Sequence, residues 1–60
     1  MSQELLRYGN SYGEVVILAH EKPPYYEVKL QRLDGYEIAY TTDSFRTAEQ
    51  IYRETIQNRL

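Results

Sequence analysis

Few side chains in this sequence could carry out nucleophilic or acid–base chemistry. His20 is the single histidine, and therefore the one base that a serine triad could use. Ser2, Ser11 and Ser44 are the candidate nucleophiles, and none of them stands in a recognisable nucleophile motif. We therefore expect no serine-based catalysis.

Three glutamates could form a carboxylate cluster. Glu14, Glu27 and Glu37 fall on the same face of the strands predicted below. Paired carboxylates can perform acid–base catalysis, but a solvated strand face gives the same pattern. The chain has no cysteine, which excludes thiolate metal sites, and one histidine makes a histidine-based site unexpected. We predict a protein that is not an enzyme and binds no metal or cofactor.

Two loop motifs resemble ligand-binding sequences. Residues 9–13 read GNSYG, but phosphate-binding loops lead directly into a helix and this one leads into a β-branched run, so we predict a plain turn. Residues 23–26 read PPYY, which spells the P-P-x-Y motif of WW-domain ligands. Because the prolines fall between two strands and Tyr26 lies on the core face, we predict a rigid hairpin loop instead.

The totals describe a small, mildly acidic chain. Its 60 residues allow one domain, residues 1–60, and its net charge is −2. Because phosphate binding depends on a basic excess, this charge disfavours a nucleic-acid partner. The chain lacks a membrane-length apolar run and a signal-peptide pattern, so we expect a cytoplasmic protein without a membrane partner. Small domains without disulfides or metals often gain stability by oligomerising.

Hydrophobic patterning predicts an α+β fold. Strands over residues 14–20, 25–32 and 36–42 form an antiparallel meander within residues 14–42, followed by a helix over residues 47–59. Residues 1–13 form either an arm ending in a helical turn or an edge strand, and the strand is favoured. The expected architecture is therefore β-β-β-α, with three strands, or four if the arm pairs, and the helix on one face.

Turn chemistry predicts the strand register. A type I turn at Leu33-Asp34 followed by a left-handed Gly35 pairs Arg32 with Tyr36. A four-residue loop before Tyr25 pairs it with His20. A shift of one residue would turn every side chain to the other face, so these registers define the core face. Its residues are Val15, Ile17, Ala19, Tyr26, Val28, Leu30, Tyr36, Ile38 and Tyr40.

The predicted helix carries its own start and packing signals. Thr47 and Gln50 fit a capping box, and Glu49 and Arg53 form a favourable i,i+4 pair. One apolar stripe recurs at helical spacing and should lie on the core face of the sheet. It consists of Ala48, Ile51, Tyr52, Thr55, Ile56 and Leu60.

Residues 34–56 resemble parts of two known families. Asp34-Gly35-Tyr36, Asp43 and Thr47-Ala48-Glu49 are similar to the body of HicB-like antitoxins, although the glycine-rich strand of that family is missing. The F-R-T-A-E opening after a three-stranded sheet also resembles AP2 and integrase-arm DNA-binding domains. Those families read DNA with a sheet rich in arginine and tryptophan, and this chain has no tryptophan. The resemblance implies a layout of sheet followed by capped helix, and we assign neither family.

The outer face of the predicted sheet gives two functional hypotheses. Four residues there are uncharged and largely apolar, and they should be covered by the N-terminal arm, a second copy or a protein partner. They are Val16, Leu18, Tyr25 and Ala39. The first hypothesis is thus a small protein-binding or regulatory module, or a homodimer. The alternative is a nucleic-acid-binding module whose sheet contacts come from Tyr25, Lys29, Gln31 and Arg32.

Overall fold

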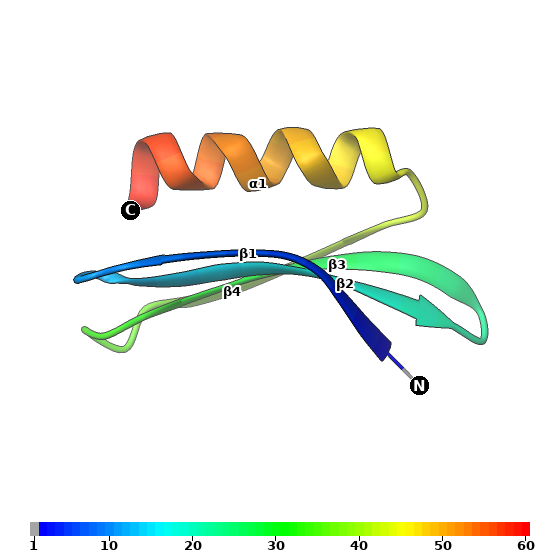
Figure 1. Cartoon of the computed structure of the whole chain (residues 1–60), viewed down its shortest axis with the longest axis horizontal. Helices are drawn as coiled ribbons and strands as arrows, with labels where there is room; N and C mark the ends of the chain where they lie inside the picture. Colours follow the sequence, from blue (N-terminus) through cyan, green and yellow to red (C-terminus); the bar gives the residue numbers. More distant parts are fainter. Residues whose placement is uncertain (1) are drawn as a thin grey trace.

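The computed structural model of the chain describes residues 2–60 and shows one helix packed on one face of an open antiparallel sheet (Figure 1). The sheet has four strands in the order β1-β2-β3-β4. Their bounds are β1 Ser2–Asn10, β2 Gly13–Glu21, β3 Pro24–Arg32 and β4 Glu37–Thr42, and the helix α1 spans Phe45–Arg59. The predicted α+β meander with a C-terminal helix is confirmed, and the N-terminal segment contributes a fourth strand.

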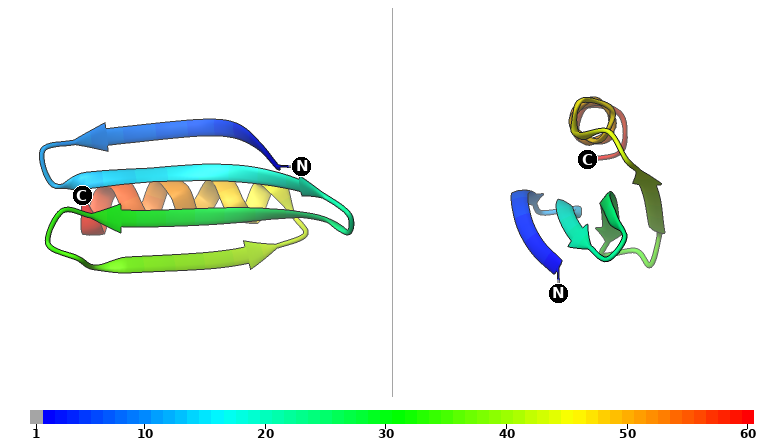
Figure 2. Two further views of the ribbon diagram at one scale, coloured as in Figure 1. Left: turned by 90° about the horizontal axis from the view of Figure 1, so that it is seen from below. Right: turned by 90° about the vertical axis from the view of Figure 1, so that its right-hand side faces the viewer.

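The helix lies over the middle of the sheet. Figure 2 shows α1 behind the gap between β2 and β3, with β1 and β4 extending beyond it on either side. The buried side chains come from β2, β3 and the helix, with Ile17 and Val15 the largest that are fully enclosed. The complete core is Val15, Ile17, Val28, Leu30, Ala48 and Tyr52, with Tyr26, Ile51, Ile56 and Leu60 packed against it.

Both predicted registers are confirmed. His20 pairs with Tyr25 across β2 and β3, and Leu30 pairs with Ile38 across β3 and β4. The strands of the first hairpin continue to the pair Glu21–Pro24, so the connection is shorter than the predicted four residues.

The second hairpin turns as its sequence predicts. The Arg32 amide donates to the carbonyl of Tyr36 at 2.9 Å, and the Gly35 amide donates to the carbonyl of Arg32 at 3.1 Å. Gly35 has a φ of 94°, in the left-handed region that glycine enters without steric cost. This is the bulged type I hairpin, and it determines which β4 backbone groups face β3.

The helix begins two residues earlier than predicted. Ser44, not Thr47, is the N-cap, and the Ser44 side chain accepts a hydrogen bond from the Thr47 amide at 3.3 Å. The predicted capping box at Thr47 and Gln50 is therefore wrong. Phe45 also contributes to the early start, because its ring packs edge-on against Tyr26 with centroids 5.5 Å apart.

Ser44→Ala should therefore destabilise the protein by about 1 kcal/mol, because it leaves an amide of the first helical turn without its side-chain acceptor. Urea denaturation followed by circular dichroism measures this loss. Thr47→Ala is the matched control and should cost much less, because Thr47 lies inside the helix. Equal losses would place the cap at Thr47 and contradict the observed hydrogen bond.

Ile38 and Tyr40 lie on the predicted core face but do not belong to the buried core. Val28 and Leu30 of β3 are buried, but Ile38 and Tyr40 opposite them are 38% and 43% exposed, respectively. Tyr36 is similarly exposed. An α-helix with its side chains is about 10 Å across and strands lie about 4.8 Å apart, so one helix covers about two strands. The helix-facing side of β4 is consequently left open.

Candidate functional site

The outer face of the sheet, opposite α1, carries a small apolar centre. Val16 is 7% exposed and Leu18 is half-buried. β1 does not lie across this face, because it pairs with β2 at the edge of the sheet. Instead Val16 is flanked by Arg7 on β1 and Lys29 on β3, which are its register partners. The long stems of such side chains cover apolar surface while their charges stay in water.

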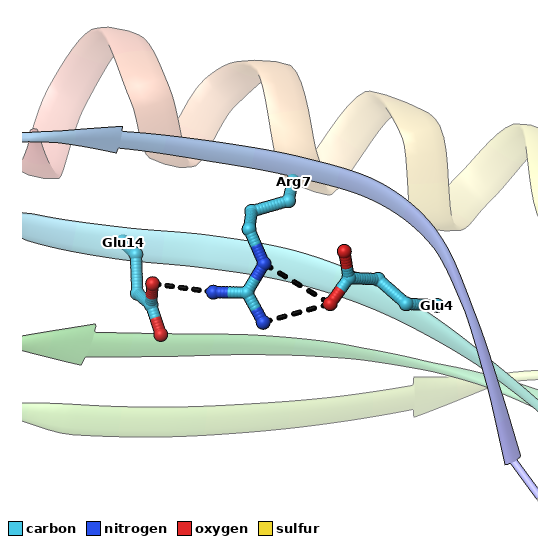
Figure 3. Close-up of polar contacts among 3 residues, drawn as sticks. All are labelled: Glu4, Arg7 and Glu14. Carbon is cyan, nitrogen blue, oxygen red and sulfur yellow. Dashed lines mark hydrogen bonds and ion pairs between the residues drawn. The ribbon is translucent and has the colours of Figure 1, made fainter.

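Arg7 organises an ion network on this outer face. Its guanidinium lies between two carboxylates, donating to Glu4 Oε1 at 2.7 Å through Nη2 and to Glu14 Oε2 through Nη1 (Figure 3). The hydrogen bonds from Arg7 hold the pKa of Glu4 below its ordinary value. The same contacts raise the pKa of Arg7, so the guanidinium stays charged.

The depressed Glu4 pKa gives a testable dependence on pH. The pKa of Glu4 is lower in the folded state than in the unfolded state. The pairing with Arg7 therefore stabilises the fold fully at pH values above the unfolded-state pKa, and this stabilisation is lost as pH falls through the folded-state pKa. Arg7→Gln should return the Glu4 pKa to its ordinary range, measured by NMR titration of the side-chain carboxyl. Arg53→Gln, on the helix, is the control and should leave it unchanged. An unaltered Glu4 pKa in Arg7→Gln would show that the pair does not form in solution.

The three glutamates of the predicted carboxylate cluster have different partners. Glu14 binds Arg7, Glu27 Oε1 lies 2.9 Å from His20 Nε2, and Glu37 accepts from Gln31 Nε2 at 3.0 Å. Within residues 2–60, no set of three or more acidic or histidine side chains is grouped so that it could hold a metal ion.

The residues of the nucleic-acid hypothesis lie on two faces. Tyr25, Lys29 and Gln31 alternate along β3 on the outer face, whereas Arg32 shares the helix-facing side with Leu30. Arg32 is engaged there by Asp34, with Nη2 and Oδ2 2.6 Å apart. On the outer face the Tyr25 and His20 rings stack at 4.4 Å. A base would have to displace that stack to use the Tyr25 ring face that His20 covers.

Exposed large apolar side chains lie elsewhere, on the outer strands β1 and β4, in the hairpin turns and at the start of α1. Beside β4, a cleft of about 360 Å³ separates the strand from the helix. Ile38 and Tyr40 form its floor, and Ile51, Thr55 and Arg59 form the helical wall. The full set of exposed large apolar residues is Leu5, Leu6, Tyr8, Tyr12, Leu33, Tyr36, Ile38, Tyr40 and Phe45.

The backbone of β4 offers hydrogen-bonding groups to the open edge of the sheet. Opposite pairs in an antiparallel ladder alternate between bonded and non-bonded. Since the Arg32 amide bonds to Tyr36, the bonded pairs with β3 continue through Ile38 and Tyr40. The intervening Ala39 and Thr41 therefore direct their N–H and C=O groups away from β3. We call this strip of backbone, with the cleft beside it, the β4 edge.

Of the four strand residues of the β4 edge, the sequence predicted Ala39 as a partner-binding residue but not Ile38, Tyr40 or Thr41. Ala39 was a predicted partner-binding residue and lies here, while the other three, Val16, Leu18 and Tyr25, lie on β2 and β3. Their partner-binding role stays a prediction. Ile38 and Tyr40 were assigned to the core, because alternation predicts the face of a strand but not whether a helix reaches it.

The comparisons with known proteins add no family. No protein-family model, no curated protein and no solved structure matches the chain. Over residues 2–60, no helix combines the length and the apolar character that spanning a membrane requires.

Proposed function

We propose that the chain is a small, non-catalytic protein-binding module that takes an extended partner segment at the β4 edge. The observation that carries this proposal is the exposure of Ile38 and Tyr40 beside a strand edge with free backbone groups. Strand addition at a sheet edge obtains affinity from the backbone and specificity from alternate side chains. At this edge the cleft beside α1 would receive those alternate side chains.

Charge supports a polypeptide ligand rather than a nucleic acid. The net charge is −2, and two of the three lysine and arginine residues on the strands are engaged, Arg7 by Glu4 and Glu14 and Arg32 by Asp34, while Lys29 is exposed. Phosphate binding requires cations that are available to the ligand. An extended peptide with apolar side chains at alternate positions makes no such demand.

Selection of displayed random peptides against the immobilised protein tests the proposal. At low density, where copies cannot pair, the selected peptides should carry apolar residues at every second position. Thr41→Pro should reduce their affinity at least tenfold, because it removes an outward-facing N–H without removing a bond to β3. Leu33→Ser, in the exposed hairpin turn, is the matched control and should bind as the unmodified protein does. Selected peptides that bind Thr41→Pro equally well would contradict the proposal.

A further inference from the structure

The two edges of the sheet differ in how they are protected against pairing. β1 carries a bulge between Glu4 and Leu6, and its Arg7 is charged and exposed. Bulges, charged side chains and prolines are the devices by which natural sheets block edge-to-edge pairing. β4 pairs with β3 without a register shift, and from Ile38 to Thr42 it contains no charged residue and no proline. β4 is therefore the edge that remains open to another strand.

We propose that this edge pairs with β4 of a second copy of the same chain, antiparallel, with Ala39 opposite Ala39 of the partner subunit. This inference rests on the proposed function and names the partner. The pairing joins two sheets into one continuous sheet about a dyad perpendicular to it. A rotation about this axis turns the second sheet within its own plane and does not turn it over. Both helices therefore lie on the same side of the joined sheet.

Self-complementarity argues for a second copy in this register. Backbone groups match only if outward-facing residues oppose one another, which limits the dyad to a few positions. With Ala39 at the dyad, Ile38 lies opposite the partner's Tyr40, and by symmetry Tyr40 lies opposite the partner's Ile38. An aromatic side chain opposite a β-branched one is a favourable cross-strand pair. On the outer face Glu37 meets the partner's Thr41, so no like charges are opposed.

The neighbouring registers are less favourable. A dyad at Ile38 would set Tyr36 against the partner's Tyr40, but Tyr36 is already held by Arg59, whose Nη1 donates to its hydroxyl at 2.7 Å. A dyad at Tyr40 would set Ile38 against the partner's Thr42 and lose the apolar pair. A dyad at Glu37 would oppose two carboxylates directly, which is destabilising.

Single cysteines report the register directly, because the chain has no cysteine of its own. Opposite residues in a bonded antiparallel pair have Cα atoms about 5.5 Å apart, which lies within the range of roughly 4.4–6.8 Å that a disulfide spans. Ala39→Cys should form a covalent dimer on mild oxidation. Glu37→Cys and Thr41→Cys should each remain monomeric alone but cross-link when mixed. Ser11→Cys, in the distant turn between β1 and β2, is the control and should not cross-link.

Light scattering coupled to size exclusion provides the second measurement. The mass of the unmodified protein should rise toward twice the chain mass with concentration, while Thr41→Pro should remain a monomer with an unchanged circular dichroism spectrum. A monomer at every concentration, or cross-linking of Thr41→Cys with itself, overturns the proposed dimer. If selected peptides still bind at the β4 edge in that case, the proposed function survives and the partner is another protein. If neither pairing nor peptide binding occurs, both proposals fail.

Discussion

Ile17→Ala is expected to lower the free energy of unfolding by about 2–5 kcal/mol. Ile17 is 0% exposed and lies between Leu6 of β1 and Val28 of β3 in the register. Truncation removes buried methyl groups and leaves a cavity that the neighbouring strands can fill only in part. A 60-residue domain has a total stability on the order of 3–9 kcal/mol. Urea denaturation should therefore show a variant that has lost a large share of its stability.

Ile38→Ala is the matched control for Ile17→Ala. The two residues are of the same type and lie on the same face, but Ile38 is 38% exposed, so its truncation should cost clearly less. The unfolding free energies of the two variants should be compared at low protein concentration, where the proposed dimer is dissociated. Equal losses under that condition would mean that β4 is covered within the monomer, contrary to the observed position of α1.

Gly13→Ala is expected to destabilise the protein by about 1–3 kcal/mol through steric overlap rather than a cavity. A Cβ at Gly13 would lie 2.5 Å from the carbonyl oxygen of Gln31 and 2.7 Å from Cα of Arg32. Both are backbone atoms, so the β2 and β3 strands would have to separate locally. The φ of 158° is a further constraint on any residue with a side chain. Thermal denaturation should show a lower midpoint.

Gly9→Ala, in the paired strand across the turn, is the control for Gly13→Ala. A Cβ there would meet its nearest neighbours at 3.6 Å, which is ordinary van der Waals contact. This variant should be neutral or slightly stabilising, because alanine restricts the unfolded chain more than glycine does. If Gly13→Ala were stable and Gly9→Ala unstable, the close approach of the β3 backbone to Gly13 would be contradicted.

Local chemistry made the strand pairing predictable. The turn residues Leu33, Asp34 and Gly35 set the register of β3 and β4, and alternation then assigned each side chain to a face. The cap was less predictable, because Ser44 and Thr47 are both good N-cap residues. The helix starts at Phe45, whose ring contacts Tyr26. Local sequence does not predict this contact, because the two residues are far apart in the chain.

The candidate site was less predictable than the fold. Ala39 could be found from the sequence because an apolar residue on an outer face stands out against its polar neighbours. Val16 met the same criterion, but only the assembled sheet shows that it is 7% exposed beside Arg7 and Lys29. The ion network around Arg7 joins β1 to β2. It was not predicted, because the sequence left two conformations open for the N-terminal segment.

The sequence by itself determined the strands β2 to β4, their registers and the face on which each of their residues lies, because periodicity and turn geometry act over a few residues. Only the tertiary structure decided which residues of the helix-facing side are covered. One helix lies over β2 and β3 and is too narrow to cover the outer strands as well, so Ile17 becomes core while Ile38, on the same face, remains 38% exposed. That difference in cover creates the β4 edge.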